Sequence, residues 1–161
     1  MSETPVNGSG APAEGERVFS LRKLYIKDFS FEAPNSPAFF LDTKLQPEVN
    51  LNIRTAHSDL GNGSTEVVLH MTAQSVAGER TAFLIEVAQA GLFQISGFSK
   101  EEARAIIGVH CPNALYPYAR EAISSMVQRG GYPPLVLQPM DFAALFAQAS
   151  QDTAAAQASQ A

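Results

Sequence analysis

The run TAFLIEVAQAGLFQISG, residues 81–97, constrains the fold more than any other stretch of this chain. Large apolar residues stand at every second position from Phe83 to Val87, and successive side chains of a β-strand point to opposite sides of a sheet. The pattern therefore predicts a long strand with one bulky apolar face. Leu84 and Glu86 share the other face, where an apolar side chain beside a carboxylate indicates a contact surface.

Three more strands are predicted by the same kind of alternation, at residues 18–32, 48–56 and 65–76. The alternation in the first strand wavers around Leu24, which predicts a β-bulge there. A glycine-rich hairpin connection at residues 57–64 and a short turn at 77–79 join the later strands. Strands that follow one another through turns favour an antiparallel sheet.

Residues 33–47 separate the first two strands and hold three prolines around the apolar run Phe39, Phe40 and Leu41. Because proline removes a backbone donor and fixes φ, we expect an irregular crossover loop. Its adjacent large apolar side chains either enter the core or line a groove beneath the loop.

Helices are predicted after residue 96. Ser99 and Glu102 have the spacing of a capping box, and the helix that they begin should end at Gly108. A longer helical segment is predicted from Pro112 to the glycine pair at 130–131, and Asp141 is a good N-cap for a last, shorter helix.

The predicted fold class is therefore α+β, with a four-stranded antiparallel sheet, a long helix and a shorter C-terminal helix. Residues 17–149 should form one domain. Residues 1–16 and 150–161 have few large apolar side chains and are expected to be disordered tails.

Several function classes are disfavoured by composition. The formal net charge of −5 and the scarcity of adjacent basic residues argue against nucleic-acid binding. Cys111 is the single cysteine, so no intramolecular disulfide forms and a reducing compartment is expected. No apolar run reaches membrane-spanning length and the N-terminus does not resemble a secretory signal, so we expect a cytoplasmic protein without membrane insertion.

Sequence patterns of catalysis are also missing. The chain has no phosphate-binding glycine loop, and its carboxylates form no evident general acid/base pair. His110 and Cys111 are the only close pair of soft ligands, which is too few for a tetrahedral metal site. We therefore expect no enzyme activity, no metal and no cofactor.

Five sequence segments resemble those of a known family: KDFSFEAPNSP, LQPEVNLNI, EVVLHMTAQS, TAFLIEVAQAGLFQISG and CPNALYPYAREAISSMVQRGGYPPLVLQPMDFAALF. Together they resemble the SecB protein-export chaperone family over about residues 18–148. The resemblance implies an ATP-independent holdase that keeps precursor proteins unfolded and delivers them to the SecA translocase. It also implies a homotetramer built as a dimer of dimers.

Site residues follow from the resemblance by matching positions. The SecA-binding acidic surface of the family corresponds here to Asp28, Glu32, Leu84 and Glu86, which alternation places on one face of the sheet. Positions that support association of dimers correspond to Ile85, Val87 and Gln89. The client-binding groove corresponds to Phe39, Phe40, Leu45, Phe83, Tyr116, Tyr118 and Met126, with Leu45 standing where relatives carry a tryptophan.

Two alternatives stay open from the sequence. A SecB-like chaperone devoted to an antitoxin would share the fold, although the matching acidic positions favour export. A small-ligand-binding or hydrolytic α+β protein would need a closed pocket with convergent polar groups, whereas the groove candidates are mostly apolar.

Overall fold

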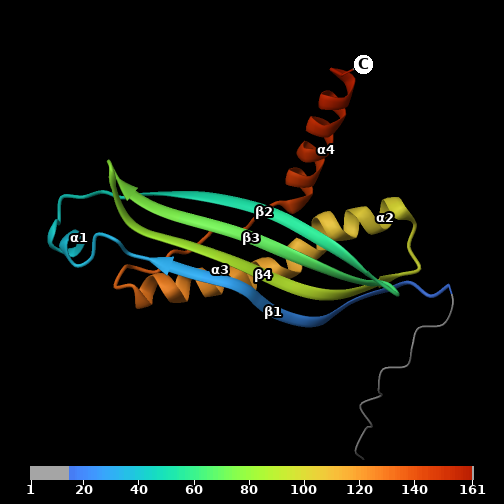
Figure 1. Cartoon of the computed structure of the whole chain (residues 1–161), viewed down its shortest axis with the longest axis horizontal. Helices are drawn as coiled ribbons and strands as arrows, with labels where there is room; N and C mark the ends of the chain where they lie inside the picture. Colours follow the sequence, from blue (N-terminus) through green and yellow to red (C-terminus); the bar gives the residue numbers. More distant parts are fainter. Residues whose placement is uncertain (1–14, 161) are drawn as a thin grey trace, which may run out of the picture.

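The computed structural model describes residues 15–160, and a four-stranded antiparallel sheet dominates them (Figure 1). Its strands stand in the order β1-β4-β3-β2. Their bounds are β1 (Val18–Glu32), β2 (Glu48–Gly61), β3 (Ser64–Ala77) and β4 (Arg80–Ser96). The predicted fold class is confirmed, and the strand that begins at Arg80 lies inside the sheet with a partner on each side.

β1 contains two register shifts, between Leu21 and Lys23 and between Ile26 and Asp28. The two bulges flank Leu24, where the sequence predicted one. Each bulge adds a residue that has no partner in β4 and so resets which side chains face the core. Beyond the second bulge the pairing with β4 is regular, from Asp28 to Glu32.

The helical part is continuous from residue 100 to residue 129 and comprises α2 (Lys100–Ala105), the π-helix η1 (Ile106–His110) and α3 (Cys111–Arg129). The capping box of Ser99 and Glu102 is present as predicted. The prediction that the helix ends at Gly108 is wrong. Gly108 lies inside η1, where a Cβ atom would collide with the ring of Phe146, so glycine here gives room to α4.

α4 (Phe142–Ala158) begins at the predicted N-cap, because the Asp141 carboxylate accepts a hydrogen bond from the Ala144 amide at 3.0 Å. It continues beyond residue 149, so the prediction of a disordered tail from residue 150 is wrong for the part that the structure describes. The alanine and glutamine residues of this segment favour a helix even without packing, and α4 projects away from the sheet (Figure 1). The predicted N-terminal tail lies almost wholly outside the described residues.

One turn of helix, α1 (Ala38–Leu41), interrupts the crossover loop that was predicted to be irregular. It lies at the end of the sheet opposite α2 (Figure 1).

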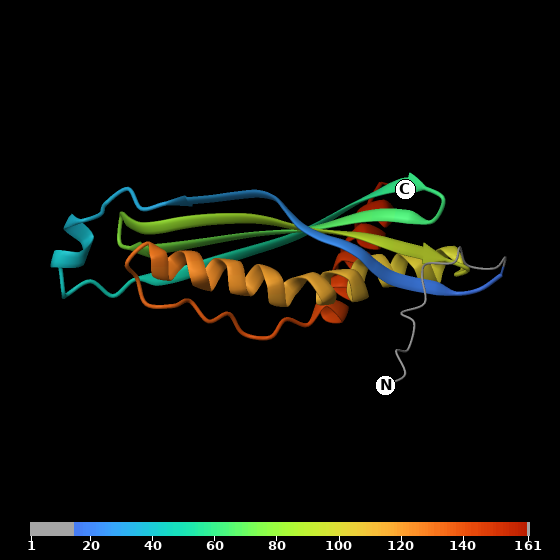
Figure 2. The same ribbon diagram turned by 90° about the horizontal axis from the view of Figure 1, so that it is seen from below.

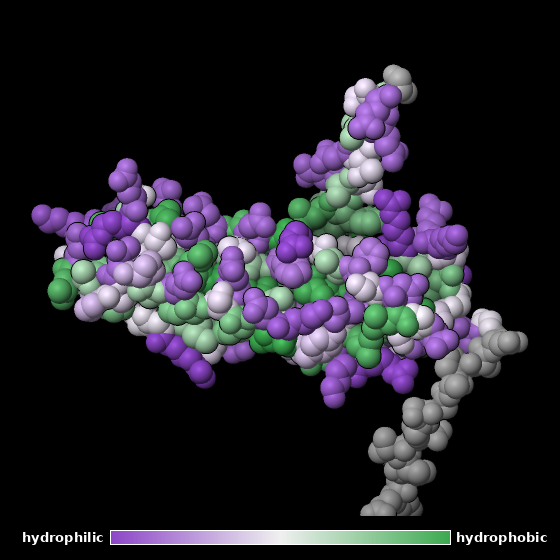
Figure 3. Space-filling view, in the orientation of Figure 1, coloured by the Kyte–Doolittle hydropathy of each residue, from purple (hydrophilic) through white to green (hydrophobic). Residues whose placement is uncertain are grey.

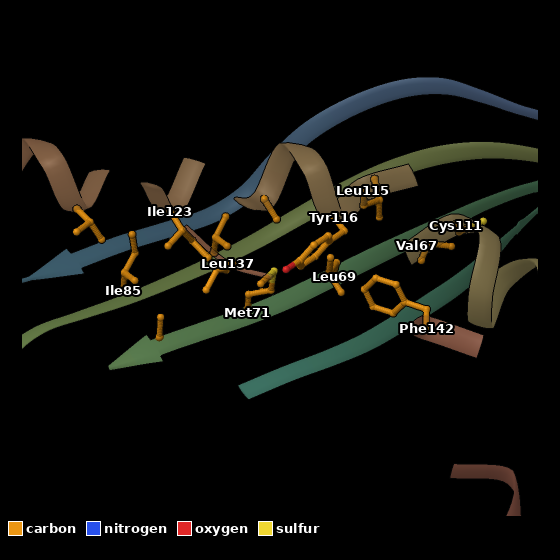
Figure 4. Packing of buried hydrophobic residues seen from close by; sticks show 14 of the residues in the cluster. Val67, Leu69, Met71, Ile85, Cys111, Leu115, Tyr116, Ile123, Leu137 and Phe142 are labelled. Atoms are coloured by element: carbon orange, nitrogen blue, oxygen red, sulfur yellow. The ribbon is translucent and has the colours of Figure 1, made fainter. Parts of the chain in front are cut away.

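The core lies between one face of the sheet and α3 (Figure 2). Its fully buried members include Val67, Leu69, Met71, Ile85, Leu115 and Ile123 (Figure 4). α3 packs on β4 and β3, which leaves the inward face of the edge strand β2 largely uncovered. The opposite face of the sheet, here called the outer face, is covered by no helix from the described part of the chain, residues 15–160 (Figure 2). Among residues 15–160, no helix is long and apolar enough to cross a membrane.

Candidate functional site

The four residues of the acidic surface lie together on the outer face of the sheet, as alternation predicted. Glu32 of β1 is directly opposite Leu84 of β4, while Asp28 and Glu86 occupy the same face of the same two strands. The three carboxylates are exposed, and Leu84, which lies beside Glu32 and two residues from Glu86 on the same face, is half-buried. The structure therefore brings these four residues together, and their binding role stays a prediction.

Charge on the acidic surface is left uncompensated within the described chain. None of its three carboxylates forms an ion pair with a residue between 15 and 160. Lys27, the nearest lysine in sequence, instead pairs with Glu66 at 2.9 Å between Nζ and Oε1. Glu66 also accepts a hydrogen bond from the Tyr25 hydroxyl, and this bond together with Lys27 lowers the pKa of Glu66. The arrangement suits a cationic partner, with Leu84 available for apolar contact.

The three residues assigned to association between copies point the other way, toward α3. Ile85, Val87 and Gln89 are 0%, 2% and 3% exposed, so their side chains are packed inside the chain. The Gln89 side chain also donates a hydrogen bond to the Tyr25 carbonyl at 3.2 Å. In this fold the three residues support the sheet beneath α3 and offer no surface of their own, so any effect on association would be indirect. Their role between copies stays a prediction.

Three of the seven groove candidates meet beside the crossover loop in an aromatic cluster formed by Phe39, Phe40, Phe83 and Tyr132. The Tyr132 ring lies 6.0, 5.1 and 5.2 Å from the rings of the three phenylalanines in that order, measured between centroids. Phe39 and Phe83 are buried, whereas Phe40 is 45% exposed. Leu45 is half-buried against the core. Tyr132 was not among the predicted groove residues, because a tyrosine between a glycine pair and a proline pair is not part of a periodic pattern.

The other three candidates lie on α3 and are not brought to this cluster. Tyr116 is buried, packs edge-on against Phe142 and donates a hydrogen bond to the carbonyl of Gln138. Met126 is half-buried against the core, and Tyr118 is 49% exposed. The seven candidates therefore divide between a loop cluster, the core and an exposed helix position.

An apolar cavity of about 620 Å³ lies between β2, the α2–η1 helix and α4. Its lining is mainly apolar and includes the basic side chains of Lys100 and Arg104. The lining residues are Ile53, Thr55, His57, Lys100, Ala103, Arg104, Ile107, Gly108, Phe142, Leu145, Phe146 and Ala149. None of these residues was among the predicted groove residues. Apolar surface is visible at the base of α4 (Figure 3).

The inward face of β2 joins the cavity to the crossover loop. Val49 and Leu51 are 42% and 38% exposed there, and Ile53, which follows on the same face, already lines the cavity. Leu41 of α1 is 82% exposed near the start of this strip. We call the surface from Phe40 and Leu41 along Val49 and Leu51 to the cavity the β2 groove. Apolar side chains dominate this surface, so it suits an extended polypeptide better than a small polar ligand.

Cys111 is fully buried at the junction of η1 and α3. Desolvation by burial raises the pKa of its thiol from 9.0 to about 12. His110 beside it is exposed, and among residues 15–160 no group of three histidine, cysteine or carboxylate side chains could hold a metal ion.

We predict that Cys111 is inert in the folded protein, because the thiolate is the reactive form. Labelling by a thiol reagent at pH 8 should be at least roughly 100-fold slower than in denaturant. Since the folded-state pKa lies above the unfolded value, the thiol contributes stability below pH 9 that is lost as the pH rises toward 12. Fast labelling in the native state would show that the thiol is accessible.

Comparison with known sequences identifies one family. The family model described as "Preprotein translocase subunit SecB" matches residues 12–153. The protein-export protein SecB of Stenotrophomonas maltophilia is 44% identical over 150 residues, which covers 92% of this chain and 87% of that protein. The SecB protein of Methylococcus capsulatus is 48% identical, and the match covers 84% of this chain and 87% of that protein. The SecB protein of Nitrosococcus oceani is 39% identical, and the match covers 99% of this chain and 98% of that protein.

A solved structure has the same fold. The SecB-like chaperone of Mycobacterium tuberculosis, in complex with a peptide from the HigA1 antitoxin, superposes with a TM-score of 0.64 at 19% identity. The match covers 76% of this chain and 90% of that one, and at this identity it supports the fold alone.

Proposed function

This chain belongs to the SecB family, and we propose that it is an ATP-independent chaperone of protein export that holds precursor proteins unfolded. The observation that carries the proposal is the β2 groove, which offers an elongated apolar surface beside a sheet edge. A holdase needs adaptable apolar contacts with weak sequence preference, because its clients share exposed apolar segments rather than one motif.

The proposal is tested by refolding of a slow-folding precursor without nucleotide. The purified protein in molar excess is expected to delay refolding, because binding of the unfolded chain competes with folding. Unchanged refolding at molar excess would refute the holdase function.

Leu51→Asp should weaken client binding about tenfold, because it puts a charge into the apolar strip of the β2 groove. Leu51 is already 38% exposed, so the fold should tolerate the change. The matched control is Asn52→Asp, which introduces the same carboxylate on the next residue of β2 but on the outer face. Titration of a labelled, permanently unfolded polypeptide measures both affinities. Equal loss in the two variants would indicate a general charge effect and not a groove.

Delivery to SecA is the second part of the proposal. The acidic surface combines three exposed carboxylates with the half-buried Leu84 and suits a basic segment of a protein partner. Complementary charge would mainly speed and orient docking, and burial of Leu84 would add apolar contact.

We further propose a cytoplasmic homotetramer, assembled as a dimer of dimers and without a catalytic role. Sedimentation with and without SecA would measure assembly and partner binding together. A monomer at micromolar concentration would contradict the proposed assembly.

An antitoxin-directed chaperone is the second candidate, because the fold is shared with a chaperone that was solved with an antitoxin peptide. The two functions differ in their need for the acidic surface. An antitoxin chaperone would protect its client without SecA, whereas an export chaperone requires a SecA contact.

A further inference from the structure

We propose that Tyr132 is a positioning residue that fixes the crossover loop, residues 33–47, in its client-binding arrangement. The inference deepens the proposed holdase function and rests on it. It assigns a role to a side chain outside the predicted groove residues, and the assignment follows from contacts of both its hydroxyl and its ring.

The Tyr132 hydroxyl links the sheet to the loop. It donates a hydrogen bond to the Ala82 carbonyl at 3.0 Å and lies 3.2 Å from the Ser36 hydroxyl oxygen. Because its proton is directed to Ala82, the hydroxyl can accept the Ser36 proton, so both bonds form at once. One side chain thereby ties β4 to the residue that precedes α1 by two positions.

The Tyr132 ring holds the same loop through the aromatic cluster. Its neighbours Phe39 and Phe40 come from α1, and Phe83 comes from β4. Gly131 makes the close approach possible, because it has φ of +87° and a Cβ atom there would lie 3.0 Å from the Phe40 ring. The end of α3, the crossover loop and β4 therefore converge on Tyr132.

The start of β4 provides the other anchors of the loop. Asn35 donates a side-chain hydrogen bond to the Thr81 carbonyl at 2.8 Å. The Arg80 guanidinium lies 5.5 Å above the Phe39 ring and 3.6 Å from the Asp42 carboxylate. These contacts hold the loop to one strand, and Tyr132 adds the tie to the helix.

The aromatic residues have two different roles in this arrangement, as buried anchors or as exposed contacts for a client. Phe39 and Phe83 are 7% and 4% exposed and serve as anchors under Tyr132. Phe40 and Leu41 are 45% and 82% exposed on the anchored turn and are presented to a client at the end of the β2 groove. Loosening Tyr132 should therefore disorder the client-contacting residues without opening the core.

Tyr132→Phe is the decisive variant, because it removes the hydroxyl and keeps the ring. Amide exchange within residues 33–45 should become about fivefold faster, as expected for loss of one hydrogen-bond tie. Affinity for a labelled, permanently unfolded polypeptide should fall about threefold to tenfold. The matched control is Tyr25→Phe, which removes a hydroxyl that is also hydrogen-bonded but lies on the outer face. It should change neither readout.

Ser36→Ala removes the loop partner of the hydroxyl and leaves Tyr132 intact, so it should accelerate exchange in the same residues to a smaller extent. The proposal is overturned if Tyr132→Phe leaves loop exchange unchanged, or if Tyr25→Phe accelerates it equally. If the parent protein binds no unfolded polypeptide, the holdase function fails. Loop exchange then still decides whether Tyr132 positions the loop.

Discussion

Gly91→Val is expected to lower the free energy of unfolding by about 3 kcal/mol or more, because the side chain has no space where α3 meets the sheet. Gly91 lies in β4 on the face that α3 covers. A Cβ atom there would lie 2.6 Å from the Phe93 ring and 3.0 Å from methyl carbons of both Leu115 and Leu21. Phe93 and Leu115 are fully buried, so neither can move into solvent.

Urea unfolding at one fixed protein concentration measures this effect, since assembly would shift the midpoint. Gly91→Ala should give a smaller loss, because it adds only the Cβ atom. Ser30→Val is the control, since it adds the same side chain at an exposed position of a strand on the outer face. Its effect should stay within about 0.5 kcal/mol. A stability of Gly91→Val equal to that of the parent would mean that α3 does not pack against this strand as described.

The sheet and its outer face could be predicted from the sequence because alternation has a period of two. The least certain part of this prediction was which side chains of β1 point to the outer face, since one bulge moves every later side chain to the other face. Both bulges of β1 come before Asp28, so the segment from Asp28 to Glu32 keeps phase with Leu84 and Glu86. The acidic surface was therefore predictable as a set.

The groove was less predictable, because it depends on which surfaces α3 leaves uncovered. Val49 and Leu51 alternate like core residues, yet α3 packs on β3 and β4 and leaves them partly exposed. Phe83 and Tyr116 look equally suited to a groove but lie in the core. Alternation identifies the apolar side of a strand, whereas exposure is decided by helix placement.

Helix ends were misjudged where local signals competed with packing. Gly108 reads as a helix end, but the space beside it is filled by Phe146 and the chain continues through η1. The segment after residue 149 has no large apolar side chains and reads as a tail, yet its alanines extend α4 to Ala158.

Glu86→Lys is expected to weaken SecA binding about 10-fold to 100-fold, or roughly 1.4 to 2.8 kcal/mol, with little effect on stability. The substitution places a positive charge between Asp28 and Glu32, in the middle of a surface that has no basic partner within residues 15–160. Glu86 is exposed and pairs across the sheet with Ser30 and Thr72, so the fold loses no ion pair. The salt dependence of binding should also become shallower, because fewer charges attract the partner.

The control for Glu86→Lys is Asp152→Lys, which changes the net charge equally at an exposed position of α4, far along the chain from the acidic surface. Calorimetric titration with SecA should give the parent affinity for Asp152→Lys and a much weaker one for Glu86→Lys. Client binding should be unchanged in Glu86→Lys, because the β2 groove lies on the inward face of the sheet. Loss of SecA binding with intact holdase activity would separate export from a chaperone that protects an antitoxin alone. Equal SecA affinity of the parent, Glu86→Lys and Asp152→Lys would show that the acidic surface is not part of the SecA docking site.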